Sequence, residues 1–255
     1  MMQEDIVKKT RPVIVFDLDD TLVDTSHVYW VARSDFVNVM ADCGLDPSVV
    51  INKFEEIDGD NMNSMGFSPG RYGKSMKDTY QWLVQNSNLV ASTRIETLVN
   101  HAGNLIFSRM PELIDGAQEL LEWCYTRFDL ILLTRGFPEL QMKKIEVSNI
   151  GHYFSSIKIV SDKKVSDFRE FILETGHSLR NAWVLGDSIK SDINPGIELG
   201  LKCILFVYTH HSYYWQQEYG KKPSGRFYLI TGLRDAINVL QHPEKSRMVE
   251  TIDDA

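Results

Sequence analysis

Short apolar runs that alternate with helix-like segments constrain the fold more than any other feature of this 255-residue chain. From residue 117 onward, strand-like runs are separated by segments in which apolar residues have helical spacing. The strand-like runs are FDLILLT (128–134), IKIV (157–160), NAWVLGD (181–187), KCILFVY (202–208) and FYLI (227–230). Nearly continuous apolar strands joined by amphipathic helices are typical of a parallel sheet covered on both faces. The sequence therefore predicts an α/β fold with a doubly wound parallel sheet.

Residues 25–110 do not share this alternation. Helical patterns occur at 26–44, 47–59, 76–86 and 91–109, and the polar stretch 58–73 is the longest loop-like segment. We therefore predict an all-helical domain at 25–110, inserted into a sheet domain formed by residues 1–24 and 111–255. After Pro243 we expect a frayed tail.

The first strand, VIVF (13–16), leads directly into Asp17 and Asp19. These residues alternate along an extended chain, so both carboxylates can point the same way. Like charges at that distance disfavour each other's ionisation unless a positive charge lies between them. The stretch therefore predicts a divalent cation that has further partners elsewhere in the chain.

Polar residues follow the other predicted strands at the same edge of the sheet, where ligands of open α/β sheets bind. They are Thr134 and Arg135, then Lys163 or Lys164, then Asp187 with Asp192 five residues later. Mg²⁺ prefers oxygen ligands, often carboxylates together with a substrate phosphate and waters. We expect Asp17, Asp187 and the backbone carbonyl of Asp19 to bind Mg²⁺ directly. Asp192 would bind it through water or orient a neighbour.

The same edge supplies groups that suit phosphoryl chemistry. The Thr134 hydroxyl, the lysine ammonium and backbone N–H groups around Leu18 and Arg135 can hold phosphate oxygens. A carboxylate at Asp17 can attack phosphorus to give an aspartyl-phosphate. Asp19 can protonate the leaving oxygen and then deprotonate the hydrolytic water.

Four motifs in order, DLDDTL (17–22), LLTRG (132–136), SDKK (161–164) and GDSIKSD (186–192), resemble those of the haloacid dehalogenase-like hydrolase superfamily. The resemblance covers most of the chain and implies a Rossmann-like core, Mg²⁺ and an aspartyl-phosphate intermediate. It implies that Asp17 is the nucleophile, Asp19 the acid/base, and Thr134 and the lysine the phosphate holders. Asp187 and Asp192 would then hold the metal. Helices inserted after the first motif resemble the helical type of cap domain.

The resemblance also bears on two alternatives. Phe168 lies five positions after Lys163, which is the family's spacing from lysine to an aromatic residue, so Lys163 is favoured and Lys164 stays open. Dehalogenases of the superfamily lack an Asp two residues after the nucleophile, so Asp19 favours phosphate chemistry. A phosphomutase or a low-turnover binding protein that retains the fold are the alternatives to a phosphatase. Arg71, Tyr72 and Lys74, or His27 and Arg33, are candidates to reach substrate from the cap.

Composition excludes some partners. The formal net charge of −8 argues against a nucleic-acid backbone, whereas a small phosphorylated metabolite stays compatible because a local cation can reverse the field of an acidic pocket. No apolar run is long enough to span a bilayer, so we expect no membrane partner. The first twelve residues have mixed charges and no apolar stretch of signal-peptide length, so we expect a cytoplasmic location. The oligomeric state stays open.

Overall fold

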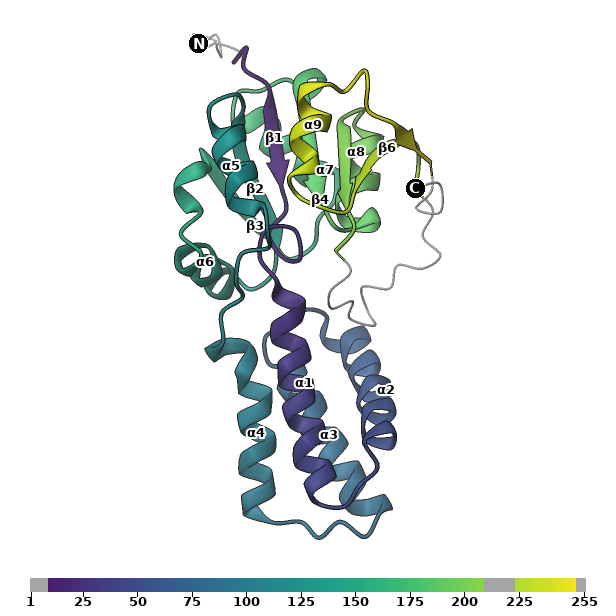
Figure 1. Ribbon diagram of the computed structural model, residues 1–255. Helices are drawn as coiled ribbons and strands as arrows, with labels where there is room; N and C mark the ends of the chain where they lie inside the picture. The colour runs from purple at the N-terminus through teal and green to yellow at the C-terminus, as the bar shows by residue number, and fades with distance from the viewer. Residues whose placement is uncertain (1–8, 209–222, 251–255) are drawn as a thin grey trace, which may run out of the picture. The chain divides into compact units, whose positions relative to one another are not determined.

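The computed structural model describes residues 9–208 and 223–250. These residues divide into two compact units (Figure 1). The core unit contains the described residues of 1–24 and 112–255, and the helical unit contains Thr25–Pro111. Each unit has its own apolar core.

A seven-stranded sheet runs through the core unit in the order β3-β2-β1-β4-β5-β6-β7. The first six strands are parallel, and only β7 pairs antiparallel, with β6. The strands are β1 (Val13–Phe16), β2 (Asp129–Arg135), β3 (Ser156–Val160), β4 (Ala182–Gly186), β5 (Lys202–Phe206), β6 (Phe227–Ile230) and β7 (Met248–Val249). This arrangement confirms the predicted doubly wound α/β fold. The prediction of a frayed tail after Pro243 was wrong for the described part, because β7 adds a short strand to the sheet edge there.

Alternation along β1 shows why both faces of the sheet are covered. Ile14 and Phe16 belong to one apolar cluster, and Val13 and Val15 belong to the other. All four side chains are buried, since successive residues of a strand point to opposite faces. The first cluster includes α5 (Ala117–Tyr125) and α9 (Asp235–Gln241), and the second includes α7 (Val165–Glu174). Two further helices are α6 (Pro138–Val147) and α8 (Asn194–Glu198).

The helical unit consists of α1 (Thr25–Asp42), α2 (Pro47–Met65), α3 (Arg71–Asn86) and α4 (Thr93–Ser108). Local signals explain two of the helix starts. Asp46 caps α2 by accepting a hydrogen bond from the backbone N–H of Ser48 at 2.8 Å, and Ser92 caps α4 through Ile95 N–H. Helices α3 and α4 approach closely where Gly73 meets Gly103, since a Cβ at Gly103 would lie 2.7 Å from the Gly73 Cα atom.

The predicted loop at 58–73 was wrong. Helix α2 continues to Met65, and α3 begins at Arg71. The polar residues that suggested a loop instead join the two helices: Asp58 is buried, forms an ion pair with Arg71 and accepts a hydrogen bond from Ser75 Oγ at 2.6 Å. Tertiary contacts therefore override the low helix propensity of this stretch.

Three of the proposed substrate-contacting residues have partners within this unit. Arg71 is buried beside Asp58, and Tyr72 is buried and donates a hydrogen bond to the backbone carbonyl of Tyr29 at 3.1 Å. Arg33 forms an ion pair with Glu55 at 2.7 Å. These contacts give the three side chains structural roles. Two other candidates also have partners: Lys74 pairs with Asp78, and the ring of His27 stacks on that of Trp30.

Candidate active site

The strand order reverses between β1 and β4, and this switch point collects the predicted site residues. β2 and β3 lie on one side of β1, whereas β4, β5 and β6 lie on the other. Asp17 follows the last residue of β1, Asp187 follows the last residue of β4, and Thr134 is the next-to-last residue of β2. Crevices of open sheets form at this position because the flanking connections leave in opposite directions.

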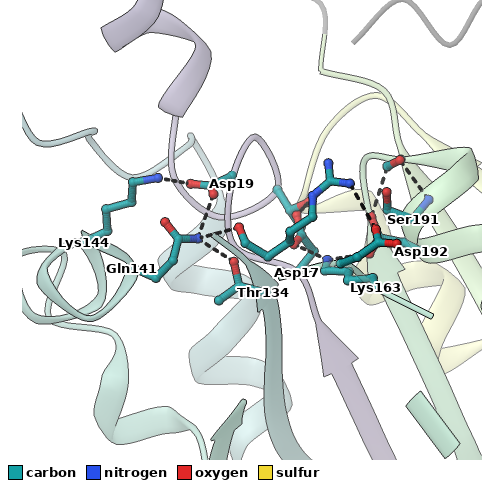
Figure 2. A network of polar contacts seen from close by, with 12 residues as sticks. Asp17, Asp19, Thr134, Gln141, Lys144, Lys163, Ser191 and Asp192 are labelled. Carbon is teal, nitrogen blue, oxygen red and sulfur yellow. Dashed lines mark hydrogen bonds and ion pairs between the residues drawn. The ribbon is translucent and has the colours of Figure 1, made fainter. Parts of the chain in front are cut away.

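Three carboxylates meet at this edge. Oxygen atoms of Asp17, Asp187 and Asp192 all lie within 4.8 Å of one another. The Lys163 ammonium forms ion pairs with Asp17 and, at 2.7 Å, with Asp192 (Figure 2). Lys163, Asp17 and Asp192 are buried, and Asp187 is half-buried. The structure therefore gathers four predicted residues from three strand ends around one point.

The electrostatics of this group favour an added cation. Burial raises the pKa of Asp17 to about 6, against the effect of Lys163 and with the help of the charge of Asp192. Burial and the charges of Asp17 and Asp20 raise the pKa of Asp187 well above its ordinary value. Three carboxylates with oxygen atoms this close form a donor set that fits Mg²⁺, which takes oxygen ligands. Asp17, Asp187 and Asp192 are the side chains that would hold it.

Gly186 provides the space that the Asp192 carboxylate occupies. A Cβ at position 186 would lie 2.4 Å from Asp192 Cγ, so a side chain there would displace the carboxylate. Asp192 lies in a π-helical turn, Ile189–Ile193, that follows β4. Its other oxygen accepts a hydrogen bond from the backbone N–H of Ser188 at 3.2 Å. The close spacing of Gly186 and Asp192 is thus a packing requirement of the site.

The Asp19 carboxylate has different partners, which sequence reasoning missed. Gln141 and Lys144 of α6 donate to it: Lys144 Nζ lies 2.6 Å from Oδ1, and Gln141 Nε2 lies 2.8 Å from Oδ2. Gln141 Nε2 also lies 2.6 Å from Thr134 Oγ1. Figure 2 shows the Asp19 contacts on one side and the contacts of Asp17 with Lys163 on the other. The sequence carries a usable signal for these contacts. Gln141 and Lys144 are three residues apart in the helix that directly follows LLTRG, so they share a face of that helix.

The remaining predicted residues have clear positions. Lys164 is exposed at the start of α7, where its backbone N–H donates to Asp167, so Lys163 is the lysine at the carboxylate group. Arg135 forms an ion pair with Asp162 at 3.7 Å, and its backbone carbonyl accepts from Gln141 at 3.3 Å. A further residue that was not predicted, Thr21, donates its hydroxyl proton to Asp17 Oδ2 at 3.0 Å.

Comparison with known proteins identifies the family. Residues 12–200 match the family model described as haloacid dehalogenase-like hydrolase. The chain is a haloacid dehalogenase-like hydrolase. The match contains all four motifs and every site residue named above.

The glyceraldehyde 3-phosphate phosphatase of Pyrococcus abyssi is 27% identical over 77% of this chain and 81% of its own length. The protein of the same name from Pyrococcus furiosus is 25% identical over 92% of this chain and 95% of its own.

Solved structures of this hydrolase family share the fold. A haloacid dehalogenase-like hydrolase from Xanthomonas campestris superposes with a TM-score of 0.70 at 20% identity, over 96% of this chain and 98% of the other. YfnB from Bacillus subtilis, solved bound to magnesium, gives a TM-score of 0.60 at 19% identity over 91% of this chain and 100% of its own. Among the described residues, no helix has the length and apolar character needed to cross a bilayer.

Proposed function

We propose that this hydrolase is a Mg²⁺-dependent phosphatase that cleaves a small phosphate monoester through an aspartyl-phosphate. The observation that carries the proposal is the separation of two carboxylates only two residues apart. Asp17 belongs to the group with Lys163, Asp187 and Asp192, whereas Asp19 is held with Thr134 through Gln141. One carboxylate is thus available for attack and the other for proton transfer.

The chemistry has two steps. An oxygen of Asp17 attacks phosphorus, and the bond to the ester oxygen breaks as that oxygen takes the proton of the Asp19 carboxyl group. Asp19, now ionised, accepts a proton from water as the water oxygen attacks the phosphorus of the aspartyl-phosphate. Phosphate leaves, Asp17 regains its carboxylate and Asp19 regains its proton.

The other residues support these steps. The Thr134 hydroxyl, the Lys163 ammonium and the backbone N–H of Arg135 would hold the phosphate oxygens and stabilise their charge in the transition state. Bound Mg²⁺ would neutralise charge on the phosphoryl group and the surrounding carboxylates. Asp17, Asp187, Asp192 and the backbone carbonyl of Asp19 are its proposed ligands.

Asp19 favours phosphate ester hydrolysis over dehalogenation. An alkoxide leaving group needs a proton, whereas a halide leaves without one, so a residue placed for proton transfer serves the first reaction only. The names of the Pyrococcus relatives support a small phosphorylated metabolite as substrate. We propose that the helical unit is the cap that selects it.

The test is an assay of phosphate release from 4-nitrophenyl phosphate and a panel of metabolite phosphates that includes glyceraldehyde 3-phosphate. It is run with Mg²⁺ and with EDTA, on the wild type and on Asp17→Asn, which keeps the shape but removes the nucleophilic charge. We expect release that requires Mg²⁺ and falls to background in the variant. A 2-haloacid serves as the comparison substrate. Halide release without phosphate release would overturn the proposal.

A further inference from the structure

Helix α6 carries two buried polar side chains that the mechanism above does not use. Gln141 and Lys144 are 1% and 6% exposed, although lysine and glutamine are usually found at the surface. They are three residues apart, so they lie on the same face of the helix. Lys143 between them is exposed. Burial of two such side chains requires partners that compensate for their loss of hydration.

Those partners are the two oxygens of a single carboxylate. Lys144 Nζ lies 2.6 Å from Asp19 Oδ1, and Gln141 Nε2 lies 2.8 Å from Asp19 Oδ2. Because each oxygen has its own donor, rotation of the carboxylate about its terminal bond breaks at least one contact. A charged hydrogen bond from the ammonium is the stronger of the two.

Gln141 also joins Asp19 to the phosphate-holding residue. Its Nε2 atom lies 2.6 Å from Thr134 Oγ1, so one amide contacts both the proposed acid/base and the proposed phosphate ligand (Figure 2). The backbone leaves room for this amide at Gly136, where a Cβ would lie 2.8 Å from Gln141 Cδ. The connection between β2 and α6 is therefore compatible with this position of Gln141 only while residue 136 is glycine.

We propose that Lys144 and Gln141 are positioning residues that fix the Asp19 carboxylate relative to the phosphate held at Thr134; this inference rests on the proposed phosphatase function. Proton transfer to a leaving oxygen requires an acid within hydrogen-bond reach. A displacement of about 1 Å in such a group can cost on the order of 10²-fold in rate. The Lys144 ammonium holds the Asp19 carboxylate by its charge. Gln141 contacts both Asp19 and Thr134 and so fixes the distance between them.

The leaving group separates this role from a merely structural one. An alkyl phosphate needs a proton on its leaving oxygen, whereas 4-nitrophenolate leaves with little assistance. The value of kcat/KM reports the steps up to formation of the aspartyl-phosphate. Loss of a positioned acid should therefore lower kcat/KM for an alkyl phosphate far more than for 4-nitrophenyl phosphate.

The experiment measures kcat/KM for both esters with wild type, Lys144→Met, Lys144→Arg and Gln141→Met, with Lys143→Met as the matched control. We expect Lys144→Met and Gln141→Met to lower the alkyl ester value by about 10–100-fold and the aryl ester value by much less. Lys144→Arg should restore most of the alkyl ester activity, and Lys143→Met should behave as the wild type. In an Asp19→Asn background, Lys144→Met should cause no further loss, because both substitutions remove the same function.

Several outcomes would overturn the proposal. Equal losses for both esters would assign the two residues a general structural role, as would losses from Lys144→Met that add fully to those of Asp19→Asn. Wild-type kcat/KM values for both esters in Lys144→Met and Gln141→Met would remove any role of the two residues in proton transfer. These results leave the phosphatase function intact. Absence of Mg²⁺-dependent phosphate release by the wild type would instead overturn both proposals together.

Discussion

The two edges of the sheet hold carboxylates in opposite electrostatic states. At the carboxyl edge, oxygen atoms of Asp17, Asp187 and Asp192 lie close together, Lys163 pairs with Asp17 and Asp192, and the pKa values of Asp17 and Asp187 are raised. At the amino edge, Asp129 begins β2 and has three basic neighbours: Lys9 at 3.4 Å, Arg11 at 3.5 Å and His177 at 2.9 Å.

The pKa of Asp129 responds in the other direction. Burial works to raise it, but hydrogen bonds from His177 and Lys9 outweigh burial and lower it. Its carboxylate therefore stabilises the fold when ionised, whereas ionisation of Asp17 and Asp187 costs stability in the absence of a cation. The two kinds of site therefore differ in charge balance: a carboxylate balanced by basic neighbours supports the architecture, and a surplus of buried negative charge indicates a ligand.

The largest expected effect is stabilisation by Mg²⁺ at the carboxyl edge. At a concentration of about 100 Kd, binding to the folded state alone contributes roughly 2.7 kcal/mol. For a unit of this size, each kcal/mol corresponds to a Tm rise of about 2–4 °C. Thermal unfolding at pH 7.5 with and without Mg²⁺ measures this shift. Asp187→Asn should lose most of it, and Asp129→Asn should keep it; equal shifts in both variants would contradict the comparison.

Removal of one surplus charge should stabilise the metal-free protein. Asp187→Asn keeps the shape of the side chain and relieves repulsion from Asp17 and Asp20. Because burial and these charges disfavour the ionised form of Asp187 in the folded state, we expect Asp187→Asn to have a higher Tm than the wild type at pH 7.5. Thermal unfolding in EDTA measures it, with loss of phosphatase activity as the accompanying change. A lower Tm would show that Asp187 already has a compensating partner in the metal-free state.

The same chemical change at the amino edge should act in the opposite direction. Asp129→Asn removes the charge that attracts Lys9, Arg11 and His177, and we expect a loss of roughly 1 kcal/mol, because the side chain is only partly screened by solvent. Activity with saturating Mg²⁺ should stay near that of the wild type, since Asp129 lies at the other edge of the sheet. Matched unfolding curves of Asp129→Asn and Asp187→Asn in EDTA give the two signs in one experiment.

The sequence predicted the site best where chain topology alone determines position. Parallel strands bring their carboxyl ends to one edge, so Asp17, Thr134 and Asp187 were expected to meet before any packing was known. The adjacent residues Lys163 and Lys164 could be ranked only by the spacing to Phe168. The side chain that reaches Asp17 depends on how the chain turns into α7, which places Lys163 inside and Lys164 outside.

The misses arose where tertiary packing decides. Helical spacing predicted α6, but the rotation of α6 about its axis, which brings Gln141 and Lys144 to Asp19, follows from packing against the sheet. In the helical unit, Asp58 lowers helix propensity locally, yet its contacts with Arg71 and Ser75 stabilise the helices around it. Packing also decides that Asp17 and Asp19, which were expected to share a cation, pair with two different lysines, Lys163 and Lys144.

The smallest expected effect is a pH dependence with opposite sign at the two edges. The folded-state pKa of Asp129 is below its unfolded value of about 3.9, so its stabilisation is present above pH 4 and is lost as the pH falls through the folded value. The destabilisation caused by Asp129→Asn should therefore shrink below about pH 4.

At the carboxyl edge, Asp17 has a raised pKa of about 6. The stability cost of its ionisation therefore disappears as the pH falls from about 6 toward 4 and the carboxyl group becomes neutral. The benefit of Asp187→Asn should also shrink as the pH falls, because protonation of the carboxyl groups in this cluster relieves the same repulsion. Unfolding of wild type and both variants in EDTA between pH 3 and 8 measures the two ranges. Parallel curves for the three proteins would contradict the assignment of opposite charge balance to the two edges.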